Sequence, residues 1–377
     1  MTYKSGKIVF SITLLLLSVT VGFFQIARAE QTPISIQQRQ QYDIDKHCTT
    51  HLNEIPNMQQ IPTYFNCGHA TFFDNGTTLR QYSLIIEENH KIPITLPEDS
   101  VKPVMFPAWT FNSSIPGPTL RMTAGDHIQI TVINKGTMPH SMHMHSIHPG
   151  AMDGVPIVSG DSGLIPAGKS FTYNFVAAPV GIFPYHCHMN PVAKHINMGL
   201  YGGLIIDPSA NNARPSAHEL VMYLSGFDLS FKKPYPSMIN STQANALMNV
   251  NDDGEPVDTN MTETIPDEHD NSIYAVNGIA NYYMHHPFQI KLHEPVRLYV
   301  FNMLDFEENS FHLHGQVFQY YPSGTSKTPS FVNDVISLSQ GDRGIIETKF
   351  NYPGNYMSHA HIEQIGGRGW SSLFSVK

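Results

Sequence analysis

The stretch His127-Ile128-Gln129-Ile130-Thr131-Val132-Ile133 alternates polar and apolar side chains as far as Val132. Successive side chains of a β-strand point to opposite faces of the sheet, so this alternation predicts a strand that buries one face. Two further stretches of short-strand character are Gln81-Tyr82-Ser83-Leu84-Ile85-Ile86-Glu87 and Ser170-Phe171-Thr172-Tyr173-Asn174-Phe175. The first half of the chain is therefore predicted to consist of short strands.

Turn-forming residues separate these strands. Examples are Asn112-Ser113-Ser114-Ile115-Pro116-Gly117-Pro118 and Pro166-Ala167-Gly168. The 377 residues include 27 glycines and 27 prolines, and only 14% are charged, a composition that suits many strands joined by tight turns. We expect residues 81–210 to form a Greek-key β-sandwich domain.

The same layout returns in the second half of the chain. Residues 272–278 echo residues 109–112, and residues 296–302 echo the strand at 127–133. Two copies of one β-fold explain this repeat most simply. The sequence therefore predicts an all-β protein with two tandem Greek-key β-sandwich domains, the second covering residues 215–377.

The N-terminus has the pattern of an export signal. Lys4 and Lys7 precede an uncharged apolar run over residues 8–24, and Ala27-Arg28-Ala29 offers a cleavage site. A transmembrane anchor is the alternative, but the run is short for a membrane span, which favours a signal peptide of residues 1–29 cleaved after Ala29. We then expect a periplasmic or secreted protein whose residues 30–80 form an irregular N-terminal extension.

The net charge is −9, and the sequence shows no cluster of lysine or arginine that would bind phosphate groups. An acidic surface argues against a nucleic-acid partner, because nucleic-acid binding depends on neutralising phosphate charge. After signal cleavage, no other long apolar stretch predicts stable membrane insertion.

The three cysteines have different settings. Cys48 and Cys67 are close in sequence and are predicted to form a disulfide in an oxidising compartment. Cys187 remains alone, within Tyr185-His186-Cys187-His188. A free thiol between two imidazoles oxidises unless its sulfur is occupied, and a bound metal would occupy it.

Four His-x-His pairs occur in the chain, two in each predicted domain. They are His143/His145, His186/His188, His312/His314 and His359/His361. Residues two apart in a strand point to the same face, so each pair directs two imidazoles one way. Satisfied core histidines are the alternative, but eight buried imidazoles without a metal would leave many polar groups to satisfy. We expect the eight to hold three copper ions if the two domain faces meet.

A second group overlaps the first. His140, Cys187 and His195 offer two imidazoles and one thiolate, the ligand composition of a blue-copper site. Because Cys187 is bonded in sequence to His186 and His188, an electron that reaches its sulfur has a through-bond route to the second group of histidines.

The sequence resembles the multicopper oxidases, in particular the two-domain laccase-like members related to copper nitrite reductases. The residues that carry this resemblance are Trp109-Thr110-Phe111-Asn112, Pro116-Gly117-Pro118-Thr119-Leu120-Arg121, His140-Ser141-Met142-His143-Met144-His145, Met152-Asp153-Gly154-Val155-Pro156, His186-Cys187-His188, Phe311-His312-Leu313-His314-Gly315 and His359-Ala360-His361.

The resemblance implies that both sandwich domains are cupredoxin-like. It also implies a role for each ligand and about four copper ions per subunit. It assigns His140, Cys187 and His195 to type 1 copper and His143 and His312 to type 2 copper. The type 3 pair would be held by His145, His186, His188, His314, His359 and His361. It also implies a homotrimer in which each cluster lies between the first domain of one subunit and the second domain of its neighbour.

The chain departs from the family pattern at the axial type 1 position. Leu200 stands where many members have methionine, and Met198 lies two residues earlier. A site without a thioether ligand is expected to have a raised reduction potential. The spacing from Cys187 to His195 also differs from that of typical laccases.

Two acids are candidate proton donors. Asp153 matches the acid beside type 2 copper in laccases, and Glu363 follows His361 closely. An Asp-Gly turn is the alternative role for Asp153.

The predicted reaction is oxidation of a small-molecule or metal-ion reductant, with O2 reduced to water. One alternative is a copper nitrite reductase, although His143 and His188 add ligands that a single type 2 copper does not need. A second alternative is a copper storage protein, since methionines such as Met142, Met144 and Met189 surround the ligands. Packing in the cores of the sandwiches is the preferred explanation of these methionines.

Overall fold

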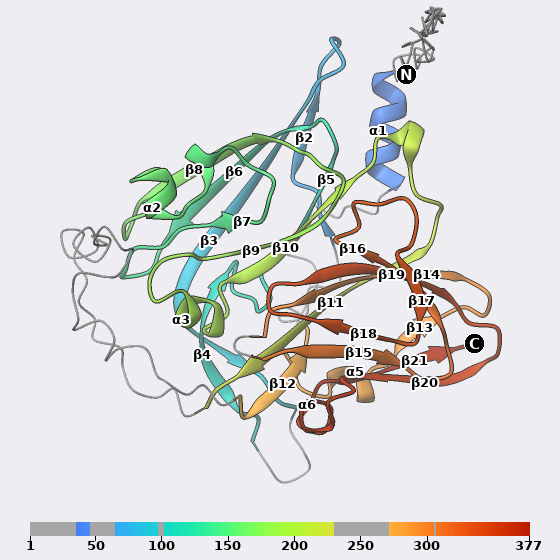
Figure 1. Cartoon of the computed structure of the whole chain (residues 1–377). Helices are drawn as coiled ribbons and strands as arrows, with labels where there is room; N and C mark the ends of the chain where they lie inside the picture. Colours follow the sequence, from blue (N-terminus) through green and yellow to red (C-terminus); the bar gives the residue numbers. More distant parts are fainter. Residues whose placement is uncertain (1–34, 46–64, 97–101, 230–270, 305–306) are drawn as a thin grey trace, which may run out of the picture. The chain divides into compact units, whose positions relative to one another are not determined.

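The protein is described from a computed structural model that covers residues 35–45, 65–96, 102–229, 271–304 and 307–377 (Figure 1). Strands dominate these residues and are arranged in four sheets. The predicted signal peptide lies outside the described residues. No described helix is long and apolar enough to cross a lipid bilayer.

The first sandwich consists of two five-stranded sheets. In one, the strand order is β1 (Phe65–Asn66), β5 (Thr119–Thr123), β10 (Tyr201–Asp207), β9 (Gly181–His186) and β7 (His143–Met144). In the other it is β2 (His69–Phe72), β3 (Thr78–Pro93), β6 (His127–Asn134) and β8 (Ser170–Val176), with β4 (Met105–Phe111) also paired to β3. Ile128, Ile130 and Val132 of β6 are buried between the two sheets, as the sequence alternation predicts.

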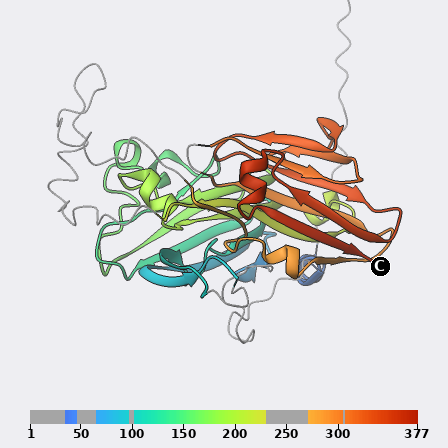
Figure 2. The same ribbon diagram turned by 90° about the horizontal axis from the view of Figure 1, so that it is seen from below.

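The second sandwich lies beside the first (Figures 1 and 2). Its six-stranded sheet has the order β12 (Ile273–Val276), β11 (His218–Phe227), β14 (Pro295–Asn302), β19 (Arg343–Lys349), β16 (Phe318–Pro322) and β17 (Phe331–Asn333). Its five-stranded sheet has the order β13 (Phe288–Ile290), β21 (Ser371–Val376), β20 (Gly354–His359), β15 (Asn309–Leu313) and β18 (Val335–Leu338).

The two sandwiches repeat one topology. In the first, β6 pairs in parallel with β3 and antiparallel with β8; in the second, β14 pairs in the same way with β11 and β19. The other sheets also correspond, since β10 lies between parallel β5 and antiparallel β9, just as β21 lies between β13 and β20. The all-β class and the repeated fold predicted from the sequence are thus confirmed.

Short helices occupy the connections. They are α1 (Ile36–Asp45), α2 (Pro156–Ser159), α3 (Val192–Asn197), α5 (Tyr282–His285) and α6 (Glu363–Gly367), with 3-10 turns η1 (Gly150–Met152) and η2 (Ala210–Asn212).

The prediction that residues 30–80 form an irregular extension is wrong in part. Helix α1 forms within it, and β1 and β2 pair with β5 and β3 at the edges of the first sandwich. These strands have two and four residues, too few for an alternating pattern to stand out in the sequence. Edge strands of a sheet need a covering segment, which this part of the chain supplies.

Only one of the two cysteines in the predicted disulfide belongs to the described residues. Cys67 is disulfide-bonded, and Cys48 lies outside the described residues, so the pairing of these two stays a prediction. Cys187 is the free cysteine of the described residues and is buried.

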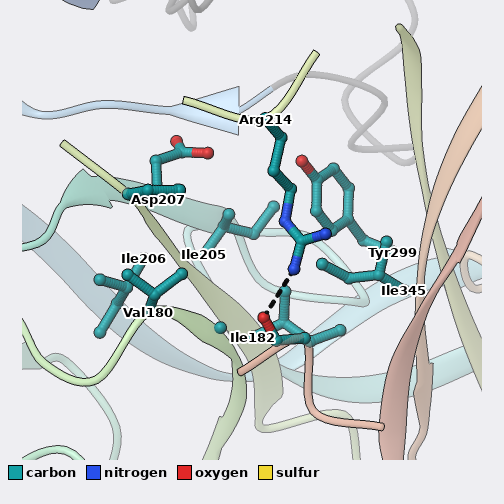
Figure 3. Close-up of a pocket in the computed structure, with 11 residues that line it drawn as sticks. Val180, Ile182, Ile205, Ile206, Asp207, Arg214, Tyr299 and Ile345 are labelled. Carbon is teal, nitrogen blue, oxygen red and sulfur yellow. Dashed lines mark hydrogen bonds between the residues drawn. The ribbon is translucent and has the colours of Figure 1, made fainter. Parts of the chain in front are cut away.

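Strand β10 joins the two sandwiches, and every one of its residues is buried. A Cβ atom on Gly203 would lie 2.6 Å from the Tyr223 hydroxyl and 2.7 Å from Cζ of Phe301, so only glycine permits this close packing. A narrow pocket at the same seam is lined by residues such as Ile182, Arg214 and Ile345 (Figure 3). Its lining contains no histidine or cysteine, and we assign no function to it.

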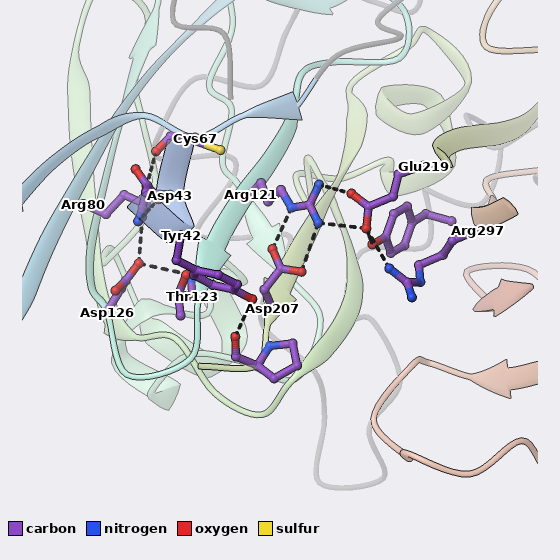
Figure 4. A network of polar contacts seen from close by, with 12 residues as sticks. Tyr42, Asp43, Cys67, Arg80, Arg121, Thr123, Asp126, Asp207, Glu219 and Arg297 are labelled. Carbon is purple, nitrogen blue, oxygen red and sulfur yellow. Dashed lines mark hydrogen bonds and ion pairs between the residues drawn. The ribbon is translucent and has the colours of Figure 1, made fainter. Parts of the chain in front are cut away.

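A buried ionic network also crosses this seam (Figure 4). Arg121 donates to Asp207 and to Glu219, and Glu219 also accepts from Arg297. Because Arg121 belongs to β5 and Arg297 to β14, the Glu219 carboxylate links the two sandwiches. Removing one partner of such a buried network would leave another charge unpaired. The intact network therefore favours the arrangement of β5 and β14 in which all of its charged groups meet.

Candidate metal centres

The first candidate centre is formed by His140, Cys187 and His195. Nδ1 of His195 lies 3.1 Å from Sγ of Cys187, and Nδ1 of His140 lies 3.6 Å from the same sulfur. The two Nδ1 atoms are 3.2 Å apart. Two imidazoles and a thiolate that converge on one point are the donor set of a blue-copper site, as the sequence predicts.

The fold brings these residues together from three connections. His140 follows β6 and pairs with Ile165, Cys187 directly follows β9, and His195 lies on α3. The Cys187 amide donates to Leu200, whose own amide donates to the His195 carbonyl. These bonds close the loop that carries two of the three ligands.

The centre is deeply buried. His140 and Cys187 are 0% exposed and His195 is 2% exposed. Neither imidazole of the centre therefore presents an edge to the surface of the chain. Trp109 packs edge-on against both imidazoles, with ring centroids 4.9 Å from His195 and 5.6 Å from His140. Lys194 lies over the same indole, with its ammonium 4.9 Å from the ring centroid.

Electrostatics favour the thiolate form of Cys187. Burial alone would raise the pKa of Cys187, but the charge of His195 and hydrogen bonding to His140 and His195 outweigh it and hold the pKa well below its usual value. The thiolate is the form that binds metals.

Glu88 is a neighbour that the sequence analysis missed. Its Oε1 lies 3.0 Å from Nε2 of His140. Burial would raise the pKa of Glu88, yet hydrogen bonds from His140, Thr137 and Met138 lower it to about 2. Glu88 is 52 residues from His140 in sequence, and no motif marks it.

The second candidate centre is a group of four imidazoles, here called the first tetrad: His143, His145, His186 and His188. His143 of β7 and His186 of β9 are directly paired in the sheet. Nε2 of His145 lies 3.1 Å from Nε2 of His186, and the His143 and His188 ring centroids are 5.2 Å apart. The predicted projection of each pair to one side is therefore observed.

Burial favours the neutral form of His145 and His186 in the first tetrad. Burial, followed by the neighbouring charges of His143 and Arg343, lowers the pKa of His145 to about 4. Burial also lowers the pKa of His186 to about 3, against a hydrogen bond to the Cys187 carbonyl that raises it. Only the neutral ring has a free lone pair for a metal.

The second tetrad consists of His312, His314, His359 and His361. Its scaffold repeats the first: His312 of β15 is paired with His359 of β20, and Nε2 of His314 lies 2.9 Å from Nε2 of His359. Ring centroids of His312 and His361 are 5.2 Å apart. Unlike the first tetrad, this one is partly open, because His314 and His361 are exposed.

Within the described residues of one chain, no group of converging ligand atoms includes members of both tetrads. The β18–β19 turn, rather than the second tetrad, lies beside the first: a Cβ on Gly341 would be 3.5 Å from Cε1 of His145. Within the described residues, a single chain therefore presents the two tetrads as separate groups.

In each tetrad, one histidine donates a hydrogen bond to the backbone carbonyl of an aspartate. Nδ1 of His143 donates to the Asp153 carbonyl at 3.0 Å, and Nδ1 of His312 donates to the Asp334 carbonyl at 2.9 Å. These bonds fix the proton on Nδ1 and leave Nε2 for a metal. The Asp153 carboxylate is also 3.2 Å from His143 and 3.3 Å from Nε2 of His148.

The sequence analysis identified Asp153 but not Asp334 or His148. Asp334 is 22 residues from His312 and has no motif, whereas His148 stands three residues after His145 and could have been noted. Glu363 is the exposed first residue of α6. No described histidine forms an ion pair with it, and its role stays a prediction.

Comparison with known proteins gives the family. Two family models, both described as multicopper oxidase, match residues 97–211 and 251–377. The chain belongs to the multicopper oxidase family. Multicopper oxidases are copper-dependent oxidoreductases, so the predicted enzyme class and cofactor are confirmed at the level of the family.

Solved structures and curated proteins agree with this assignment. The crystal structure of a multicopper oxidase is similar, with a TM-score of 0.66 and 36% identity, covering 83% of this chain and 94% of that one. The blue copper oxidase from Nitrosomonas europaea has a TM-score of 0.62 and 25% identity over 79% of this chain and 86% of that chain.

A copper-containing nitrite reductase from Neisseria meningitidis serogroup A is 26% identical over 258 residues, 66% of this chain. The match spans 58% of that relative's length.

Proposed function

We propose that the protein is an exported multicopper oxidase that takes single electrons from a reductant and reduces O2 to water. The observation that carries this proposal is the segment His186-Cys187-His188. Its sulfur belongs to the buried trigonal group, while both flanking imidazoles belong to the first tetrad. The two centres are thus joined by covalent bonds.

The ligand roles follow from the family and from the donor sets. His140, Cys187 and His195 would hold type 1 copper, and His143 and His312 type 2 copper. The type 3 pair would be held by His145, His186, His188, His314, His359 and His361. Bound copper would supply one-electron transfer and the four-electron reduction of O2, with four protons giving two waters.

The protein supplies burial, orientation and protons. The low-polarity surroundings of Cys187 keep water away from the sulfur. The carbonyls of Asp153 and Asp334 orient His143 and His312. The Asp153 carboxylate, which lies within 3.3 Å of His148 and 3.2 Å of His143, is the best-placed candidate proton relay, and Glu363 is the weaker one.

We propose that copies of the chain assemble so that the first tetrad of one meets the second tetrad of another. The exposure of His314 and His361 and the separation of the tetrads within one chain support this arrangement. A closed cyclic trimer satisfies every half-site with identical contacts.

The reductant is a small molecule or a metal ion. Because His140 and His195 are buried under Trp109 and Glu88, electrons would reach the thiolate through these covering side chains. This burial favours a donor that docks over the covering residues rather than one that touches an imidazole edge.

Nitrite reduction is the second candidate, since curated relatives are copper-containing nitrite reductases. The eight tetrad histidines argue for the oxidase, because they exceed the needs of a single type 2 copper. Export, the Cys48–Cys67 disulfide and the domain limits at 81–210 and 215–377 are part of the same proposal.

The deciding experiment combines metal analysis, absorption and O2 uptake on purified protein. The oxidase should contain about four copper ions per chain, an intense blue band from the thiolate and a near-ultraviolet shoulder from the coupled pair. It should consume O2 with a phenolic, ferrous or cuprous donor. About two copper ions and turnover of nitrite alone would indicate the reductase, and bound copper without turnover would indicate storage.

A further inference from the structure

His140 is held from both sides. Its Nδ1 faces the Cys187 sulfur, and its Nε2 lies 3.0 Å from Oε1 of Glu88. The Glu88 side chain is 5% exposed. An ionised carboxylate only accepts hydrogen bonds, so it keeps the proton on Nε2 and leaves the Nδ1 lone pair directed at the centre.

A break in strand β3 places Glu88 there. The pairing of β3 with β4 shifts register between Glu87 and His90, and Asn89 adopts a left-handed φ of 59°. A bulge of this kind re-aims one side chain out of the strand's alternation. Glu88 therefore turns toward His140, whereas its neighbour Glu87 accepts a hydrogen bond from Ser113.

The carboxylate is held by a built cradle. Oε1 accepts from the amides of Thr137 at 2.9 Å and Met138 at 3.1 Å, and Oε2 accepts from the Thr137 hydroxyl at 2.7 Å. A Cβ atom on Gly136 would lie 2.3 Å from Oε1. The cradle therefore requires glycine at position 136, and the charge of Glu88 is balanced by donors rather than by solvent.

We propose that Glu88 is a positioning residue that orients His140 and lowers the reduction potential of the type 1 site. The inference rests on the proposed type 1 role of His140, Cys187 and His195. A negative charge one imidazole away stabilises the oxidised, more positive metal more than the reduced one. Glu88 thus opposes the rise in potential expected from Leu200 at the axial position.

The test compares Glu88→Gln with its matched control Glu87→Gln in the copper-loaded protein. Glu87 and Glu88 are neighbours in β3, and each variant removes one negative charge there. Only Glu88→Gln removes a charge that lies beside His140. Spectroelectrochemical titration of the blue band should give a higher potential for Glu88→Gln than for the wild type and Glu87→Gln. Equal potentials in all three would overturn the proposal.

Gly136→Ala provides a second route to the same answer. The added methyl group would displace the flexible end of Glu88 without removing its charge from the protein. We expect its potential to shift in the same direction as that of Glu88→Gln. An unchanged potential, with His140 still ligating and the blue band intact, would contradict the role of the carboxylate.

The measurements distinguish an error in the proposed type 1 site from an error in the proposed role of Glu88. If wild-type protein loaded with copper shows no blue band, the type 1 assignment is wrong. If the wild type is blue and the midpoint potential is unchanged in both Glu88→Gln and Gly136→Ala, only the proposed role of Glu88 is wrong. The midpoint potential is independent of turnover, so a general loss of activity cannot imitate the expected result.

Discussion

At the scale of single residues, Cys187 is the point on which the chemistry depends. It is the free thiol of the described residues, it is buried, and its backbone continues directly into two imidazoles of another centre. Burial would raise its pKa, but the neighbouring His195 and His140 outweigh burial and hold the pKa well below its usual value, which favours the thiolate. A hydroxyl in its place would not be ionised and would be a harder ligand.

We therefore predict that Cys187→Ser removes the blue band and lowers donor-dependent O2 uptake by at least about 100-fold. The tetrads should still bind copper, because none of their imidazoles is altered. Absorption spectra, metal analysis and an oxygen electrode check this outcome. A serine variant that kept its colour and turnover would show that the sulfur is not a ligand.

A second residue-scale prediction concerns Asp153. Asp153→Asn keeps the backbone carbonyl that holds His143 but removes the ionisable oxygen between His143 and His148. If this carboxylate relays protons, turnover should fall by about 100-fold while reduction of the blue band by the donor keeps its rate. The exposed Asp161, changed to Asn, serves as the control and should behave as wild type.

The sequence was sufficient to predict the histidine and cysteine groups but not their surroundings. The two histidines of each pair are two residues apart in the sequence, so their spacing alone revealed the pair. Glu88 and Asp334 reach their histidines through a strand bulge and a long connection, and neither geometry is readable from local pattern. The buried position of His140 and His195 was likewise missed, because it depends on Trp109 and Glu88 covering them.

At the scale of elements, the histidine pairs share one construction. Each pair straddles the end of a strand, and the inner members face each other across a ladder, His143 with His186 and His312 with His359. The sheet therefore sets the separation of the imidazoles, and the connecting loops need only close around them. This explains why two sandwiches with different loops present similar tetrads.

Helix α1 is an element whose role the sequence did not reveal. Arg39 donates to carbonyls of Phe73, Gly76 and Thr77 in the β2–β3 turn, and Asp43 accepts from the buried Arg80. The Tyr42 hydroxyl donates to the Pro208 carbonyl (Figure 4). The helix thus fastens the edge of the first sandwich to the segment that leads into the second.

We predict that Asp43→Ala destabilises the protein by about 1–3 kcal/mol, because Arg80 then keeps a buried charge with one partner fewer. Arg80 is 2% exposed, so little of its lost hydrogen bonding is regained from solvent. Denaturant unfolding of the apoprotein measures the change, with the exposed Asp74→Ala as control. Equal stability of the two variants would mean that α1 contributes little.

At the scale of the whole molecule, duplication of the fold has produced two unequal halves. Both carry four imidazoles at the ends of equivalent strands, but only the first carries a thiolate, and only the second leaves two of its imidazoles exposed. The repeat was predictable from sequence because strand patterns and motifs recur. The separation of the tetrads within one chain was implied only by the family resemblance, because it depends on how the sandwiches pack across β10.

Complementation provides the test of assembly at this scale. His145→Ala and His361→Ala should each abolish O2 reduction, because each disables one half-site. After co-refolding of an equal mixture, about a quarter of the sites should combine two intact halves from different chains. Recovery of about that share of O2 uptake supports shared sites, whereas no recovery would place both halves of each site in one chain.

The openness of the second tetrad has a practical consequence. His312, His314 and His359 hold their ligand atoms within 4.8 Å of one another on a face that solvent reaches. Three such imidazoles form a chelate for borderline divalent ions. Untagged protein should therefore be retained on an immobilised-nickel resin when its chains are separated, and should pass through once that face is occluded by a neighbour.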